Sequence, residues 1–119
     1  MSRQSLIKEA DRLFSIYIRN RGANYGYNHC YTCGAYLPID ELQAGHFIRR
    51  GYFGVRWHPL NVWSQCNYCN VDLGGNLTKY ENKLVAQYSL LAVDALWDLA
   101  RSGSGVTEDE IREIIKKYK

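Results

Sequence analysis

Two pairs of cysteines constrain the fold of this chain more than any other feature of its sequence. Cys30 and Cys33 form one CxxC motif, and Cys66 and Cys69 form a second motif with the same spacing. A CxxC turn directs two thiolates at one ion, and four thiolates match the tetrahedral coordination that zinc prefers. Four cysteine ligands leave no open coordination position. The spacing therefore predicts a structural zinc rather than a catalytic one.

Other interpretations of the cysteines explain less of the sequence. The N-terminus lacks the apolar run of a secretory signal, and no stretch approaches the roughly 20 apolar residues that cross a bilayer. We therefore expect a cytoplasmic protein with no membrane partner, in a compartment that keeps thiols reduced. A redox CxxC or four simply buried thiols would not explain why both motifs share one spacing.

The chain of 119 residues suits a single domain with mixed helices and strands, an α+β protein. Apolar residues recur every three to four positions from about residue 3 to residue 20, which predicts a helix with a basic outer face. Short aromatic and β-branched runs follow, then a short helix from about Cys66 to the Gly74-Gly75 pair. We expect 1–27 to form the N-terminal helix and a turn, 28–76 the zinc-binding core, and 77–119 a helical C-terminal part.

Three local signals divide the C-terminal part. The helical pattern after residue 77 is broken near Ser89, which predicts one or two helices up to about residue 100. Residues 102–105 read Ser-Gly-Ser-Gly, which is typical of a short flexible connection. Thr107 and Glu110 have the spacing of a capping box, so we expect a last helix to begin there.

The segment between the two cysteine pairs carries the candidate catalytic residues. His46 lies in the run from Leu42 to Ile48, which we expect to be a strand, and Asn70 directly follows the last cysteine. Cleavage of a phosphodiester needs a base that deprotonates water and a cation that stabilises the charge growing on the phosphate oxygens. A lone histidine is more often structural than catalytic. Its assignment as a base therefore depends on the asparagines near it in the sequence, Asn61 and Asn70 among them.

Three linked motifs carry a resemblance to a known family. They are QAGHFIRRG at residues 43–51, QCNYCN at residues 65–70 and GNL at residues 75–77. The chain resembles the HNH (ββα-metal) endonuclease superfamily, within it the NinG (Rap) recombination proteins of lambdoid phages, and more distantly recombination endonuclease VII. The resemblance covers roughly residues 28–100. It implies a zinc-stapled ββα-metal (HNH) core with flanking α-helices.

The resemblance also implies a function and roles for individual residues. The protein would be a metal-dependent DNA endonuclease acting on branched or recombination-intermediate DNA of a phage, in the host cytoplasm. His46 would activate the water, Asn61 would orient the hairpin or the histidine, and Asn70 would ligate a catalytic Mg²⁺ or Mn²⁺. Many HNH enzymes carry an acidic residue or histidine immediately before the base, where this chain has Gly45. Three other residues could supply a missing ligand: Asp72, Asn76 and His58.

The basic residues suggest how DNA would be bound. The net charge is only +3, so the distribution of charge matters more than its sum. We expect Arg49, Arg50 and Arg56 to contact phosphates, although such residues can equally form a solvated face. Two other functions stay open, a zinc-stapled nucleic-acid-binding module without catalysis and a phage structural or packaging adaptor. The pair of His46 and Asn70 favours the nuclease, and a homodimer is left open.

Overall fold

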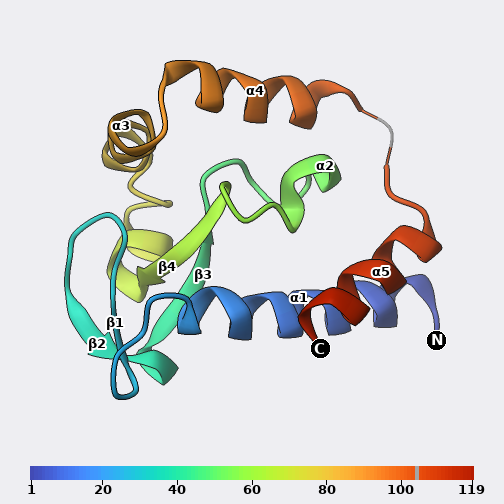
Figure 1. Cartoon of the computed structure of the whole chain (residues 1–119), viewed down its shortest axis with the longest axis horizontal. Coiled ribbons are helices and arrows are strands. Elements are labelled where there is room, and N and C mark those ends of the chain that lie inside the picture. The colour runs from blue at the N-terminus through green and yellow to red at the C-terminus, as the bar shows by residue number, and fades with distance from the viewer. Residues whose placement is uncertain (104) are drawn as a thin grey trace.

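The computed structural model describes residues 1–103 and 105–119 as helices arranged around two antiparallel hairpins (Figure 1). The predicted mixture of helices and strands is confirmed. The strands pair as β1 (Tyr27–His29) with β2 (Tyr36–Pro38) and β3 (Leu42–His46) with β4 (Val62–Cys66). The α-helices are α1 (Arg3–Asn20), α2 (Phe53–Arg56), α3 (Leu77–Gln87), α4 (Leu90–Arg101) and α5 (Glu108–Tyr118). Two shorter helical turns are η1 (Ile39–Glu41), a 3₁₀ turn, and η2 (Tyr68–Asp72), a π-helical turn.

Helix α1 has the bounds that its apolar period predicts. Its N-terminus is capped by Ser2, whose hydroxyl accepts a hydrogen bond from the backbone N–H of Ser5. The helix buries one stripe, which consists of Leu6, Ala10, Phe14 and Ile18. This stripe faces the β3–β4 hairpin and α5, and Figure 1 shows α1 and α5 side by side, with both chain termini on that side of the molecule.

The local signals in the C-terminal part are also confirmed. Ser89 separates α3 from α4, and its hydroxyl caps α4 by accepting from the N–H of Ala92. The capping box of Thr107 and Glu110 is formed in both directions at the start of α5. Ser104, in the expected flexible connection, lies outside the described residues. Among the helices that the structure describes, none has both the length and the apolar character needed to cross a membrane.

The β3–β4 hairpin lies between two apolar clusters. One cluster is gathered under α3 and α4 around Phe47, Val55 and Tyr80. The other joins α1 and α5 to the hairpin through Trp57 and Val62. Because core packs on both sides of it, this hairpin is held firmly in place, and its two ends carry the residues described next.

The short helix expected from about Cys66 differs in detail. Strand β4 continues through Cys66, and the helical turn η2 begins at Tyr68 with π-helical rather than α-helical hydrogen bonds. It ends where Gly74 and Gly75 take positive φ angles of 60° and 101°, as their pairing in the sequence predicts. A wide turn of this kind brings Cys69 back toward the end of β4. Glycine is needed at both positions because other residues rarely adopt such angles.

Candidate functional site

The four cysteines converge at one end of the β3–β4 hairpin. Cys30 and Cys33 lie in the turn after β1, Cys66 ends β4, and Cys69 lies in η2. Their sulfur atoms all lie within 4.8 Å of one another. Thiolates held about 2.3 Å from a tetrahedral zinc lie about 3.8 Å apart, and the Sγ atoms of Cys33 and Cys66 are separated by 3.8 Å. The cluster can therefore hold a metal ion such as zinc.

Hydrogen-bond donors and burial act in opposite directions on the ionisation of the sulfurs. The backbone N–H of Cys69 lies 3.4 Å from the sulfur of Cys66, and the Asn76 side-chain amide lies 3.6 Å from the sulfur of Cys69. Burial opposes ionisation of Cys30, but hydrogen bonds from Thr32 and from backbone amides outweigh it and lower its pKa to about 6. Burial prevails at Cys66, whose pKa it raises to about 12. Metal ligands must be thiolates, and a bound cation would favour the ionised form of the clustered sulfurs. Asn76 is thereby engaged at the cysteine cluster.

The opposite end of the hairpin presents His46. His46 is the last residue of β3 and pairs with Val62, whereas Leu42 at the other end pairs with Cys66. The hairpin thus connects the cysteine cluster to the candidate base. Two strands with a defined register fix the distance between these two sites.

Asn61 holds the loop that follows His46. Its side chain is fully buried, and its Oδ1 accepts from the N–H of Ile48 at 2.8 Å. Its Nδ2 donates to the carbonyls of Ile48 and Val55 at 2.9 and 3.1 Å. Of the two roles that the sequence left open for Asn61, these contacts fit orientation of the hairpin loop, because each of the three bonds goes to the backbone of that loop or of α2.

The hydrogen bond of His46 determines which of its nitrogens can act as a base. Its Nε2 lies 2.9 Å from the carbonyl oxygen of Arg56. A carbonyl can only accept, so Nε2 carries the proton and Nδ1 keeps its lone pair. Burial lowers the pKa of His46 below 6.5, the Arg56 carbonyl and Asp11 oppose that shift, and the Arg50 and Arg56 charges add to it. His46 is therefore neutral near pH 7.

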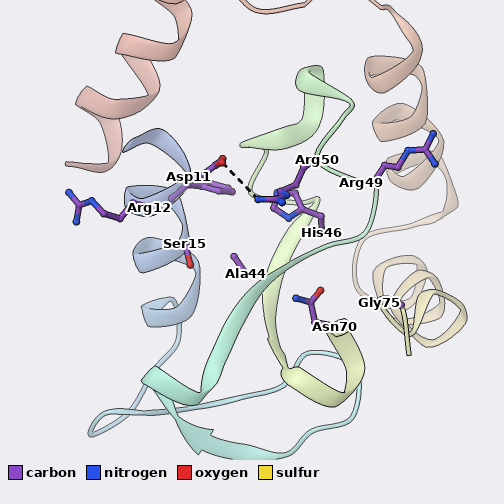
Figure 2. A pocket seen from close by; sticks show the side chains of 11 residues that line it. Asp11, Arg12, Ser15, Ala44, His46, Arg49, Arg50, Asn70 and Gly75 are labelled. Carbon is purple, nitrogen blue, oxygen red and sulfur yellow. Dashed lines mark ion pairs between the residues drawn. The ribbon is translucent and has the colours of Figure 1, made fainter. Parts of the chain in front are cut away.

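His46 opens onto a pocket of about 560 Å³ between α1, β3 and η2 (Figure 2). Of the residues selected from the sequence, it brings together His46, Asn70, Arg49 and Arg50. One wall belongs to helix α1. That wall is formed by Asp11, Arg12, Phe14 and Ser15.

Asn70 is oriented by a residue that the sequence analysis did not select. Its Nδ2 donates to Oε1 of Gln43 at 2.7 Å, and Gln43 in turn donates to Asn67. The bond from Nδ2 leaves the Oδ1 of Asn70 available as an acceptor or a metal ligand. Figure 2 shows the amide extending from η2 into the space below His46. An amide oxygen is a hard ligand of the kind that Mg²⁺ accepts.

The three selected arginines occupy different environments. The side chain of Arg50 is 63% exposed at the rim of the pocket. Arg49 is also exposed, but it points away from His46 and lies over the ring of Tyr52 (Figure 2). The side chain of Arg56, expected to contact phosphates, is only 12% exposed and is ion-paired with Asp11 at 2.6 Å. Its guanidinium is therefore committed to the protein.

The residues considered as substitutes for a ligand at position 45 lie elsewhere. Asp72 is exposed, and Nδ1 of His58 accepts from the N–H of Leu60; neither is among the described residues that line the pocket. A Cβ at Gly45 would meet Oε1 of Gln65 at 1.8 Å. A side chain at this position would therefore point at Gln65, whereas the neighbouring Ala44 and His46 face the pocket.

Asp11, like Gln43, is a residue of the site that the sequence pattern does not indicate. It is separated from Arg56 by 45 positions, and it lies on a helix whose pattern indicates only which residues face the core. No motif marks it. Its place in the pocket wall depends on the packing of α1 against the hairpin.

A family model and individual relatives of this chain indicate the same protein family. A family model described as the bacteriophage lambda NinG protein matches residues 1–119. The chain is similar to protein ninG of Escherichia phage 933W, with 29% identity over 113 residues and 94% of this chain. It is also similar to protein ninG of Escherichia phage lambda, with 30% identity over 91 residues and 76% of this chain.

These matches cover 54% and 43% of the two relatives, so the chain spans about half of their length. No solved structure matches the chain. The family model nevertheless extends from the first residue to the last and includes both cysteine pairs and the pocket. The chain therefore belongs to the NinG family of bacteriophage proteins.

Proposed function

We propose that this protein is a metal-dependent endonuclease of the HNH type that hydrolyses DNA phosphodiesters, with branched or recombination-intermediate DNA as its substrate. One observation carries the proposal. The neutral His46, with Nδ1 unprotonated, shares a pocket with the free amide oxygen of Asn70 and with Arg50. A base, a candidate cation ligand and a phosphate-binding group are the parts that this reaction requires.

Each residue has a defined task in this proposal. Nδ1 of His46 takes a proton from the attacking water, while its Nε2–H stays bonded to the Arg56 carbonyl. Asn70 binds a divalent ion through Oδ1, with Gln43 holding the amide in place. Mg²⁺ or Mn²⁺ bound there would stabilise negative charge on the phosphate oxygens, and its remaining ligands would be waters and substrate oxygens. Arg49 and Arg50 bind flanking phosphates.

The cysteine cluster has a separate task. We infer that it binds a structural zinc that fixes the end of β4 and the start of η2. Through these elements it sets the positions of His46 and Asn70. A small core gains much of its stability from such a metal.

A second candidate function is a zinc-stapled DNA-binding module without catalysis. The glycine at position 45 favours it, because this position supplies no side chain that could ligate a catalytic ion in the pocket. Of the candidate ligands, only the amide of Asn70 would then be left for such an ion. A module of this kind would bind DNA through Arg49 and Arg50 but would have no use for a buried neutral histidine.

The experiment compares cleavage of a four-way junction with cleavage of linear duplex DNA of the same sequence. Zinc-loaded protein is assayed with Mg²⁺, with Mn²⁺ and with EDTA. His46→Ala should lower the rate about 10²- to 10⁴-fold, and added metal should not restore it. Asn70→Ala should lose activity that higher Mg²⁺ or Mn²⁺ partly restores, because mass action refills a weakened site. His58→Gln, a histidine outside the pocket, is the matched control.

Two outcomes separate the candidate functions. Full activity of a folded His46→Ala protein would refute the proposed mechanism. Wild-type protein that binds DNA but cleaves none of these substrates with any ion would favour the binding module.

A further inference from the structure

We propose that Asp11 on helix α1 is a positioning residue for His46, because its carboxylate holds the peptide group whose carbonyl fixes the histidine tautomer. The catalytic consequence of this inference rests on the proposed function of His46 as a base. The tautomer itself can be measured without any activity. The two claims can therefore fail separately.

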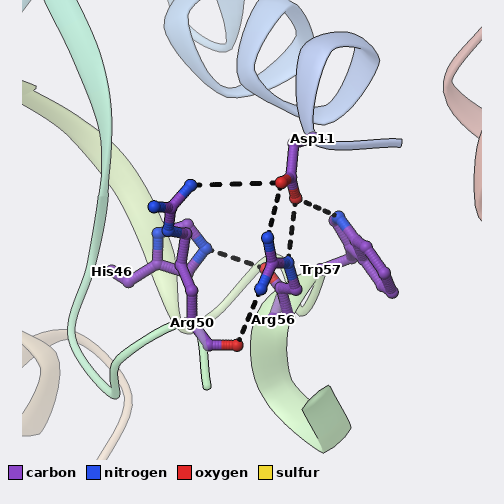
Figure 3. Close-up of polar contacts among 5 residues, drawn as sticks. All are labelled: Asp11, His46, Arg50, Arg56 and Trp57. Carbon is purple, nitrogen blue, oxygen red and sulfur yellow. Dashed lines mark hydrogen bonds and ion pairs between the residues drawn. The ribbon is translucent and has the colours of Figure 1, made fainter. Parts of the chain in front are cut away.

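The carbonyl that binds His46 belongs to the peptide between Arg56 and Trp57, and both side chains of this peptide are bonded to Asp11 (Figure 3). Nε of Arg56 donates to Oδ1 at 3.0 Å, and Nη2 donates to Oδ2 at 2.6 Å. The indole N–H of Trp57 donates to the same Oδ1 at 3.0 Å. One carboxylate thus anchors the peptide from both of its neighbouring side chains.

This anchor is needed because α2 cannot hold its own end. The helix is a single turn of four residues, Phe53–Arg56, and a turn of this length is not stable by itself. Asn61 bonds to the carbonyl of Val55, one residue before the carbonyl that binds His46. Asp11 supplies the contacts beyond that point.

The same carboxylate reaches the loop after β3. Nη1 of Arg56 donates to the backbone carbonyl of Arg50 at 3.1 Å, and the Arg50 guanidinium lies 4.0 Å from Asp11 (Figure 3). The side chains of Asp11 and Arg56 are 27% and 12% exposed, so water screens this pair less than it screens a surface pair. Paired guanidinium contacts to a carboxylate also fix direction, which a single contact does not. Asp11 therefore joins α1, the loop after β3, and α2 around the pocket.

These contacts also decide what Asp11 does. Both of its oxygens accept hydrogen bonds from Arg56, and one also accepts from Trp57. A carboxylate occupied in this way acts as an anchor rather than as a ligand of the catalytic ion. If the anchor is removed, the Arg56–Trp57 peptide can turn, and His46 can then carry its proton on Nδ1. A histidine in that tautomer cannot accept a proton from water at Nδ1.

The test replaces Asp11 with Asn, which keeps the shape but removes the charge and one acceptor. Loss of an outer partner that orients a metal-ligating histidine lowers activity by roughly 10- to 100-fold, and we expect a fall of similar size in kcat when the partner of a catalytic histidine is lost. KM for DNA should stay the same or fall, because an acidic group leaves the rim of the pocket. Glu9→Gln is the matched control, since it removes a carboxylate of α1 that pairs with the exposed Arg12.

The second readout is the tautomer of His46, from ¹⁵N NMR of histidine-labelled protein. Resonances are assigned with His29→Gln and His58→Gln variants. We expect the Nε2–H form in the wild type and in Glu9→Gln, and a mixture of both forms in Asp11→Asn. Zinc content and thermal unfolding show whether each variant is folded. If Asp11 had only a structural role, its replacement would lower the Tm without shifting the tautomer of His46.

Arg56→Lys keeps the test valid if Asp11→Asn does not fold. Lysine retains the charge but makes one contact where arginine makes two, so the same tautomer shift is expected. A pure Nε2–H form and wild-type kcat in whichever of these variants folds would overturn the proposal. A wild type that cleaves no DNA while the variants still lose the Nε2–H form would support the positioning role and refute the nuclease.

Discussion

Replacement of Gly45 by Ala should destabilise the protein although it adds only one methyl group to β3. The new Cβ would lie 1.8 Å from Oε1 of Gln65, 2.5 Å from its Cδ and 2.7 Å from its Cγ. Gln65 is fully buried, and its Nε2 donates to Thr32 at 3.0 Å and to the carbonyl of Gly75 at 2.9 Å. The side chain cannot move aside without giving up these bonds.

The size of the effect follows from these contacts. Each lost hydrogen bond lowers the free energy of unfolding by about 1 kcal/mol. Overpacking of a filled core lowers it by at least about 1 kcal/mol more. The sum is about 3 kcal/mol, and at about 4 °C per kcal/mol for a domain of this size the Tm falls by about 12 °C.

Thermal unfolding of zinc-loaded protein, followed by circular dichroism, measures this change. Gly51→Ala is the matched control, because a Cβ at Gly51 meets nothing within 4 Å. The double variant Gly45→Ala, Gln65→Ala should lose less free energy of unfolding than the two single variants lose together, because Gln65→Ala removes the group that the new methyl meets. Equal Tm values for Gly45→Ala and Gly51→Ala would refute the reasoning.

Further predictions concern the metal, DNA binding and pH. Cys69→Ser should lose both zinc and the folded state, and elemental analysis that finds no zinc in folded, reduced wild type would contradict the metal assignment. DNA affinity should fall steeply as the salt concentration rises. Arg50→Glu should weaken binding to all sequences and reduce the dependence of affinity on salt, and an affinity independent of salt would be inconsistent with phosphate contacts. Burial holds the pKa of His46 below 6.5, with Arg50 and Arg56 lowering it and Asp11 opposing them. Because only the neutral histidine can act as a base, the cleavage rate should stay constant above pH 6.5 and decline as the pH falls further. A midpoint above 6.5 in the pH dependence of kcat/KM would contradict this assignment.

Much of the fold could be predicted because its signals are local. The bounds of α1, the break at Ser89 and the capping box at Thr107 depend on residues no more than four positions apart. The four cysteines could be paired as one cluster because zinc chemistry links two CxxC motifs whatever the chain between them does. The roles of His46 and Asn70 stay predictions, although the structure brings both residues to one pocket.

The long helices α1, α3, α4 and α5, the cysteine cluster and the residue types able to do chemistry all follow from local sequence signals. Which side chains meet depends on how distant segments pack. Asp11 reaches Arg56 because α1 packs across the hairpin. Gln65 faces Gly45 because the β3–β4 register pairs Gly45 with Trp63 and Gln65 with Gln43. Asn70 meets Gln43 because η2 turns back on β3. Periodicity reports which face of an element is buried, but the partner on the other side is chosen by packing between segments far apart in the chain.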